Sequence, residues 1–126
     1  MREIKFKLWN NKQKEMQGTK VTNFFSLRCD GKVNFNSNMV TDKDMILLQF
    51  TGLLDSKGKE IYEGDIIRLD CGDERMYIVE YIINPNQSMC GFYLKRIIDS
   101  EVYSFGSFNV GIKVIGNIWE NKELLK

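Results

Sequence analysis

The residues best suited to chemistry are four carboxylates within one short stretch, Asp55, Glu60, Glu63 and Asp65. Hard cations bind through several carboxylates, and two carboxylates can divide the roles of general acid and general base. The spacing of these four matches neither an EF-hand loop nor another familiar metal motif. Turns use aspartates as side-chain acceptors, and surface glutamates pair with lysines, so we expect these carboxylates to be structural.

Histidine is absent from the chain, which removes the side chain that most often acts as general base or metal ligand near neutral pH. The three cysteines, Cys29, Cys71 and Cys90, are too far apart for the C-x-x-C spacing of zinc and redox sites. No histidine or dense cationic cluster is apparent in the sequence to activate a thiol. We therefore expect a protein that is not an enzyme and that binds no cofactor and no metal.

Two turn signals divide a mixed N-terminal half from a strand-rich C-terminal half. The run DSKGK at 55–59 provides a glycine for a tight hairpin turn, and EGD at 63–65 makes a sharp turn before the next strand. Gly52, Gly58 and Gly64 are spaced six residues apart. No Gly-Lys-Ser/Thr sequence follows them and no βαβ pattern surrounds them, so they do not indicate a phosphate-binding loop. The predicted structural turn motif comprises Gly52, Asp55, Gly58, Gly64 and Asp65.

A basic and aromatic group offers an alternative function, binding of single-stranded nucleic acid by stacking and phosphate contact. Its candidate contacts are Tyr93, Lys95, Arg96 and Lys113. Aromatic residues at alternating strand positions are more often core residues, and adjacent Lys95 and Arg96 would point to opposite faces of a strand. We therefore rank nucleic-acid binding below protein contacts.

The strand predicted from Met76 to Ile83 is mostly apolar on both faces. Such a strand either lies between two layers of one core or has one face covered by another copy. We expect self-association into a homo-oligomer through this strand. The candidate interface residues are Met76, Ile78, Val79, Tyr81 and Ile83.

The chain of 126 residues is near the modal size of a domain, and its net charge of +1 gives no global field for nucleic acid or an anionic membrane. No apolar run approaches the roughly 20 residues of a membrane span, and the opening MREIK continues as charged alternation. We expect a cytoplasmic protein with no membrane contact.

The residue pattern predicts a mainly β protein with two subdomains, 1–61 and 62–126. In the first, alternation at 4–8 predicts a strand, and FFSLR, DGK and VNF predict a hairpin. The residues after Thr41 fit either a short capped helix or a buried strand through Phe50. In the second, five short runs predict an SH3-like barrel from about Tyr62 to Trp119. These runs are Ile66–Leu69, Met76–Ile83, Phe92–Ile98, Val102–Phe105 and Ile112–Ile115.

Three blocks of the sequence resemble the YopX family of bacteriophage and prophage proteins of Gram-positive bacteria. They are FKLWNNKQKEM at 6–16, QFTGLLDSKGKEIYEGDII at 49–67 and VIGNIWENKELL at 114–125. They occur in the family's order and span the chain. The resemblance implies a β-barrel-like fold and a phage or prophage origin in a bacterial host, so a host or phage protein is a further expected partner. It implies no mechanism.

Overall fold

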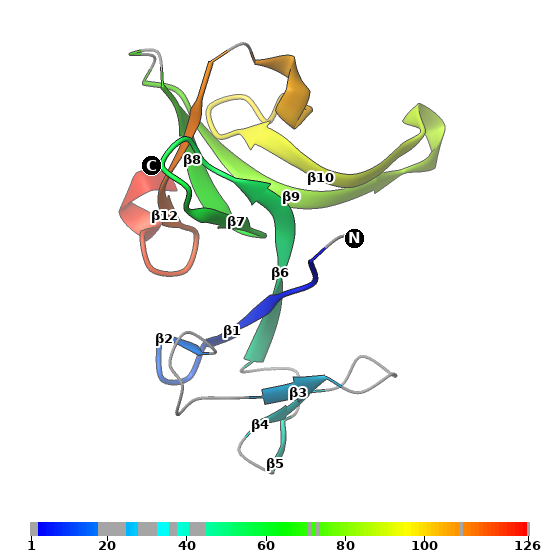
Figure 1. The fold of residues 1–126 in the computed structure, drawn as a ribbon, viewed down its shortest axis with the longest axis vertical. Coiled ribbons are helices and arrows are strands. Elements are labelled where there is room, and N and C mark those ends of the chain that lie inside the picture. Colours follow the sequence, from blue (N-terminus) through cyan, green and yellow to red (C-terminus); the bar gives the residue numbers. More distant parts are fainter. Residues whose placement is uncertain are drawn as a thin grey trace. The chain divides into compact units, whose positions relative to one another are not determined.

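The computed structural model describes residues 3–17, 25–27, 33–35, 38–40, 45–70, 72, 74–108 and 110–125 (Figure 1). These residues form antiparallel strands and three short 3₁₀ helices, which confirms the predicted mainly β fold. The chain falls into two compact units, Ile4–Gln49 and Phe50–Lys126, and the second also includes Met1–Glu3. This division lies inside a strand, whereas the subdomains predicted from the sequence meet at 61/62.

The N-terminal unit contains two sets of paired strands. β1 (Phe6–Asn10) pairs with β2 (Glu15–Gln17) and with the first half of β6 (Met45–Leu54). β3 (Phe25–Leu27), β4 (Val33–Phe35) and β5 (Asn38–Val40) form a three-stranded meander, so the predicted FFSLR and VNF hairpin is confirmed. The residues after Thr41 were expected to form either a short helix or a strand. The strand is observed over 45–50, which form the first part of β6, and 45–49 pair with β1. Residues 41–44 lie outside the described part.

The C-terminal unit begins with a hairpin and continues as a five-stranded sheet. The end of β6 pairs with β7 (Glu60–Tyr62), as the turn at 55–59 predicts. The sheet has the order β11-β10-β9-β8-β12. Its strands are β8 (Asp65–Leu69), β9 (Met76–Asn84), β10 (Met89–Arg96), β11 (Val102–Tyr103) and β12 (Ile112–Asn117). The 3₁₀ helices are η1 (Pro85–Gln87), η2 (Phe105–Ser107) and η3 (Lys122–Leu125).

The core of the C-terminal unit is built from alternating positions of these strands. Ile67, Tyr77, Val79, Leu94 and Val114 belong to one buried cluster. Alternation places every second side chain on the same face, which explains why residues 77 and 79 are buried together. The rings of Tyr103 and Phe108 pack against Tyr77 with centroids 5.9 and 5.4 Å away.

The β9–β10 hairpin extends beyond its neighbouring strands (Figure 1). β8 pairs with β9 only at Met76–Ile78, and β11 pairs with β10 only at Leu94 and Lys95. β9 and β10 themselves stay paired out to Asn84 and Met89. We call residues 81–93, the outer part of this hairpin with η1 at its end, the arm.

The bounds of one strand of the C-terminal unit, β10, differ clearly from the sequence prediction. β10 starts at Met89 and ends at Arg96, earlier than the predicted Phe92–Ile98, and Ile98 lies in a turn with 82% of its surface exposed. Pro85 ends β9 as expected, since it opens η1. No helix in the described residues has the length and apolar character of a membrane span.

Candidate functional site

Asp55 is buried at the turn between β6 and β7, with 7% of its surface exposed, and its carboxylate binds three backbone N–H groups. Oδ1 accepts hydrogen bonds from Lys57 at 2.9 Å and Lys59 at 2.8 Å, and Oδ2 accepts one from Val114 of β12 at 3.0 Å. Burial disfavours the charged form, but these hydrogen bonds outweigh it and hold the pKa of Asp55 below its ordinary value of 3.8. The carboxylate therefore joins the turn to β12.

The second turn closes around Gly64, whose φ is +85°. Its N–H donates to the carbonyl of Val79 at 2.8 Å. A Cβ on Gly64 would lie 2.1 Å from a ring carbon of Trp119, so the indole packs directly on this glycine. Next to it, Asp65 Oδ2 accepts a hydrogen bond from the Tyr62 N–H at 2.8 Å.

Asparagines shape the turn of the C-terminal segment, and a backbone hydrogen bond joins this segment to Gly64. Asn117 Oδ1 accepts from the N–H of Trp119 at 3.1 Å, and Asn121 Oδ1 accepts from the N–H of Asn117 at 3.1 Å. The Ile118 N–H donates to the carbonyl of Gly64 at 3.0 Å. We call Gly64, Asn117, Trp119 and Asn121 the C-terminal latch.

The four carboxylates chosen from the sequence do not converge on one site. Asp55 and Asp65 serve as acceptors within two different turns, and Glu60 accepts a hydrogen bond from the Tyr62 hydroxyl at 3.3 Å. Within the described residues, no group of three or more His, Cys, Asp or Glu is placed to hold a metal. Gly52 and Gly58 adopt φ of +90° and +83°, so both occupy positions that favour glycine.

The cations chosen as nucleic-acid contacts have acidic neighbours. Arg96 forms a bidentate pair with Asp99, with Nε 2.9 Å from Oδ1, and its guanidinium lies 5.2 Å from the ring centre of Tyr103. This ion pair lowers the pKa of Asp99 to about 2. Lys95 Nζ is 3.7 Å from Glu80, and Tyr93 is the register partner of that glutamate on β9. Neighbouring carboxylates reduce the attraction of these cations for phosphate.

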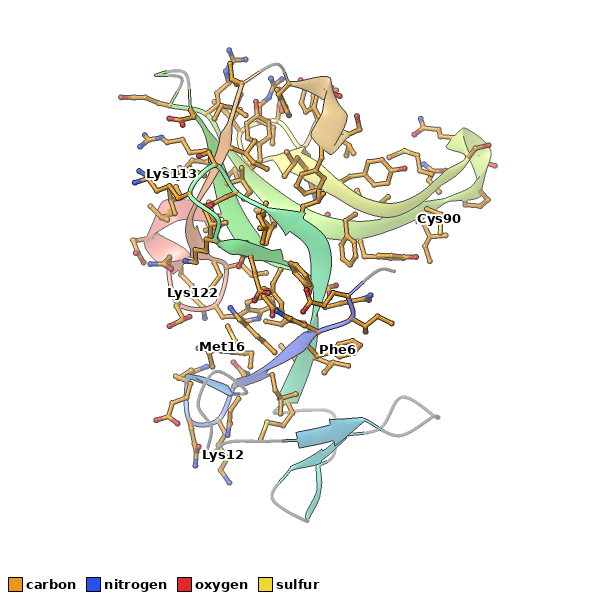
Figure 2. All side chains as sticks on the ribbon, in the orientation of Figure 1. Phe6, Lys12, Met16, Cys90, Lys113 and Lys122 are labelled. Carbon is orange, nitrogen blue, oxygen red and sulfur yellow. The ribbon has the colours of Figure 1, made fainter. Side chains whose placement is uncertain are left out.

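Lys113 does not join the other nucleic-acid candidates. It lies on β12 opposite Arg68, and β8 and β9 separate β12 from β10 (Figure 2). Neighbouring strands are about 4.8 Å apart, so the strands of Lys113 and Lys95 are about 14 Å apart along the sheet. The structure thus brings Tyr93 and Lys95 together on one face and leaves Arg96 and Lys113 elsewhere.

The face of the sheet that covers the core continues along the arm, past the end of the core. Register pairs Tyr81 with Phe92 and Ile83 with Cys90, on the same face as buried Val79. Tyr81 is 46% exposed, Ile83 is 70% exposed, and Cys90 is also exposed near the outer end of the hairpin (Figure 2). The Tyr81 and Phe92 rings meet edge to face with centroids 5.0 Å apart, and the Tyr81 hydroxyl is 3.4 Å from Cys90 Sγ.

The predicted interface residues divide according to their place along β9. Val79 is fully buried in the core, so it cannot contact a partner, whereas Tyr81 and Ile83 are exposed. Met76 and Ile78 are half-buried beside β8. Sequence reasoning missed Cys90 as part of this surface. The available signal was the absence of any charged residue from 81 to 94.

A second apolar feature of the C-terminal unit is a shallow groove of about 450 Å³ beside η2. Its apolar lining comprises Leu53, Leu54, Phe105, Val110 and Ile112, of which Leu53, Leu54 and Val110 are exposed. Asp55 also borders the groove, but its carboxylate is already occupied by backbone donors. The groove offers apolar contact and little polar chemistry.

Comparison with known proteins identifies the family of the chain. A family model described as YopX protein matches residues 4–126. The chain belongs to the YopX family. Two solved structures are similar over their full length and that of this chain. They are protein EF1440 from Enterococcus faecalis, with a TM-score of 0.63 and 24% identity, and protein yopX from Bacillus subtilis, with 0.64 and 19%. No curated protein matches the chain.

Two of the sequence blocks that resemble the YopX family lie next to each other in the structure. The two solved relatives show a shared fold, and the central and C-terminal blocks of the resemblance are the segments that meet in the C-terminal latch. Gly64 comes from the central block, and Asn117, Trp119 and Asn121 come from the last block. The most recognisable motifs of this YopX-family chain therefore stabilise its fold.

Proposed function

We propose that this YopX-family chain is a non-enzymatic accessory protein of phage or prophage origin that acts in the host cytoplasm through protein contacts. The arm is the proposed contact surface, and self-association is one of its uses. The observation that carries the proposal is the combination of exposed Tyr81, Ile83 and Cys90 with an uncharged run from 81 to 94. Exposed apolar surface of this kind is typical of protein interaction sites.

The chemistry of the arm favours a protein partner over a phosphate-rich one. Affinity for nucleic acid depends on cations that neutralise phosphates, and the arm supplies none between Tyr81 and Leu94. Beyond the arm, Lys95 and Arg96 are engaged with Glu80 and Asp99. Nucleic-acid binding through Tyr93 and Lys95 is therefore the weaker alternative.

The fold of the C-terminal unit also supports a binding role. Its strand order, with the last strand beside the first of a four-stranded meander and a 3₁₀ helix before that last strand, leads us to infer an SH3-like barrel. Small barrels of this kind supply a rigid base for binding loops and edges. The acidic residues nearest to a catalytic set, Asp55 and Asp65, support turns instead.

Light scattering across a concentration series tests self-association through the arm. We expect the wild-type mass to rise with concentration, and Cys90→Lys to remain monomeric at every concentration, because a lysine on an exposed edge strand opposes pairing with another chain. The exposed position of Cys90 predicts an unchanged melting temperature. Ile98→Lys, which alters an exposed apolar residue outside the arm, should behave as wild type. A wild-type chain that stays monomeric throughout would contradict this use of the arm.

A further inference from the structure

The outer edge of β10 is left without a β-ladder over a short, well-bounded window. β11 pairs with β10 only at Leu94 and Lys95, and no other described strand pairs with that edge. At the other end, Ser88 has a φ of +52° and bends the chain. The window is therefore residues 89–93.

The backbone groups that face out of this window can be assigned from alternation. The Arg96 N–H donates to Glu101 at 2.7 Å and the Arg96 carbonyl accepts from Ser100 at 2.8 Å, so both Arg96 groups face away from β9. In an antiparallel strand every second residue faces the same side. The N–H and C=O groups of Cys90 and Phe92 accordingly face the open edge.

The window is symmetric about Gly91 and carries no charge. Its residues are Met89, Cys90, Gly91, Phe92 and Tyr93. Gly91 has a φ of +143°, and no heavy atom other than those of its chain neighbours lies within 4 Å of where its Cβ would be. Glycine inside a strand often marks a place where another backbone approaches closely.

We propose that a second copy of the chain pairs with this edge, β10 against β10, about a two-fold axis at Gly91. This inference rests on the proposed function, because it specifies how the arm self-associates. The pairing sets Cys90 opposite Phe92 of the partner subunit and exchanges N–H···O bonds between their outward-facing backbone groups. No two like charges meet across it, since every paired residue is uncharged.

Pairing of two arms would also stabilise a hairpin that extends beyond its neighbouring strands. A two-stranded hairpin alone is at best marginally stable in water, and at least three strands with an apolar face are needed for independent stability. Joining two arms gives a four-stranded sheet whose apolar face combines Ile83, Cys90 and Phe92 of both copies. The open edge of β9 is the poorer choice, because its first residue beyond Val79 is the charged Glu80. The five-residue ladder predicts a concentration-dependent dimer.

Engineered cysteines test the register of this pairing. In the full-length chain, Phe92→Cys places a thiol opposite the natural Cys90 of the second copy, at the roughly 5.5 Å Cα separation of a hydrogen-bonded pair, which a disulfide can span. Mild oxidation should yield a dimer linked between residues 90 and 92, identified by peptide mass spectrometry. Oxidised wild type should show no link between two Cys90 residues. Ile98→Cys, an exposed cysteine outside the arm, measures how much disulfide forms by random collision.

Two readouts separate failure of the register from failure of the proposed function. In one outcome, the wild type dimerises, Cys90→Lys abolishes the dimer, and a Phe92→Cys variant that melts like wild type forms no link between residues 90 and 92. This outcome would overturn the register and leave the arm as the contact surface. A monomeric wild type without this link would overturn both the register and self-association through the arm. If Phe92→Cys does not fold, hydrogen exchange of the backbone amides in the wild type tests the pairing instead. The Cys90 and Phe92 amides should be protected at high and not at low concentration, and unchanged rates would overturn the pairing.

Discussion

Gly64→Ala is expected to destabilise the C-terminal unit by about 3 kcal/mol or more, because it combines backbone strain with a core clash. The φ of +85° is unfavourable for any L residue, and the new Cβ would lie 2.1 Å from the Trp119 ring. Relief requires the indole to leave the C-terminal latch. Gly64→Val should lose still more stability, because its branched side chain adds bulk at the same point. Thermal and denaturant melts measure both variants.

Gly58→Ala provides a matched control for the clash. Its φ is +83°, almost the same as that of Gly64, but the space beside it is open. We expect a loss of about 1 kcal/mol, the ordinary cost of placing a Cβ in this backbone region. Equal losses at positions 58 and 64 would show that Trp119 contributes nothing and would contradict the latch.

Asp55→Ala is expected to cost about 3 kcal/mol, because it leaves three backbone N–H groups without their acceptor, and that of Val114 is buried. Asp55→Asn should fall between wild type and Asp55→Ala. It keeps one oxygen for the turn but presents an NH₂ group to the Val114 N–H. Asp70→Ala removes an exposed carboxylate close to the same turn and should change little. Chemical denaturation of the three variants at neutral pH compares these losses.

The same carboxylate predicts how stability depends on pH. The folded-state pKa of Asp55 lies below its ordinary value of 3.8, so the unfolded chain takes up the proton first as the pH falls. Its stabilisation is therefore fully present above about pH 5 and is lost as the pH falls through the folded-state pKa. Asp55→Asn should show a shallower loss of stability in this acid range. An unchanged acid slope would contradict the role of this carboxylate.

The strands were predictable because their signals are local. Period-two alternation marked β1, and the turn glycines at 58 and 64 marked the hairpin and the start of β8. The residues after Thr41 were ambiguous because capping favours a helix while the ladder to β1 favours a strand. Only long-range pairing decides between them.

The contacts that stabilise the C-terminal unit were not predictable, since they join distant residues. Asp55 binds the N–H of Val114, which is 59 positions away, and Gly64 packs on Trp119. Composition and turn chemistry identified Asp55 and Gly64 as turn residues without naming these partners. The division of the chain inside β6 likewise depends on pairing on both sides of that strand.

The exposed apolar surface of the arm could be predicted only in part from the sequence. The apolar character of β9 indicated a contact surface, but alternation alone does not show where β8 ends beside it. Val79 and Ile83 occupy equivalent faces of one strand, yet the first is buried and the second is 70% exposed. The difference arises because the arm extends past the core.

Affinity capture from host cells shows whether the chain acts through protein contacts of its arm. Tagged wild type, Cys90→Lys and Ile98→Lys would be recovered under equal conditions, and the bound proteins and nucleic acids identified. We predict a specific set of bound proteins, including the untagged chain, that resists nuclease, is retained by Ile98→Lys and is lost from Cys90→Lys. Recovery of nucleic acid that disappears in Tyr93→Ala and Lys95→Ala, with Cys90→Lys unaffected, would contradict the account.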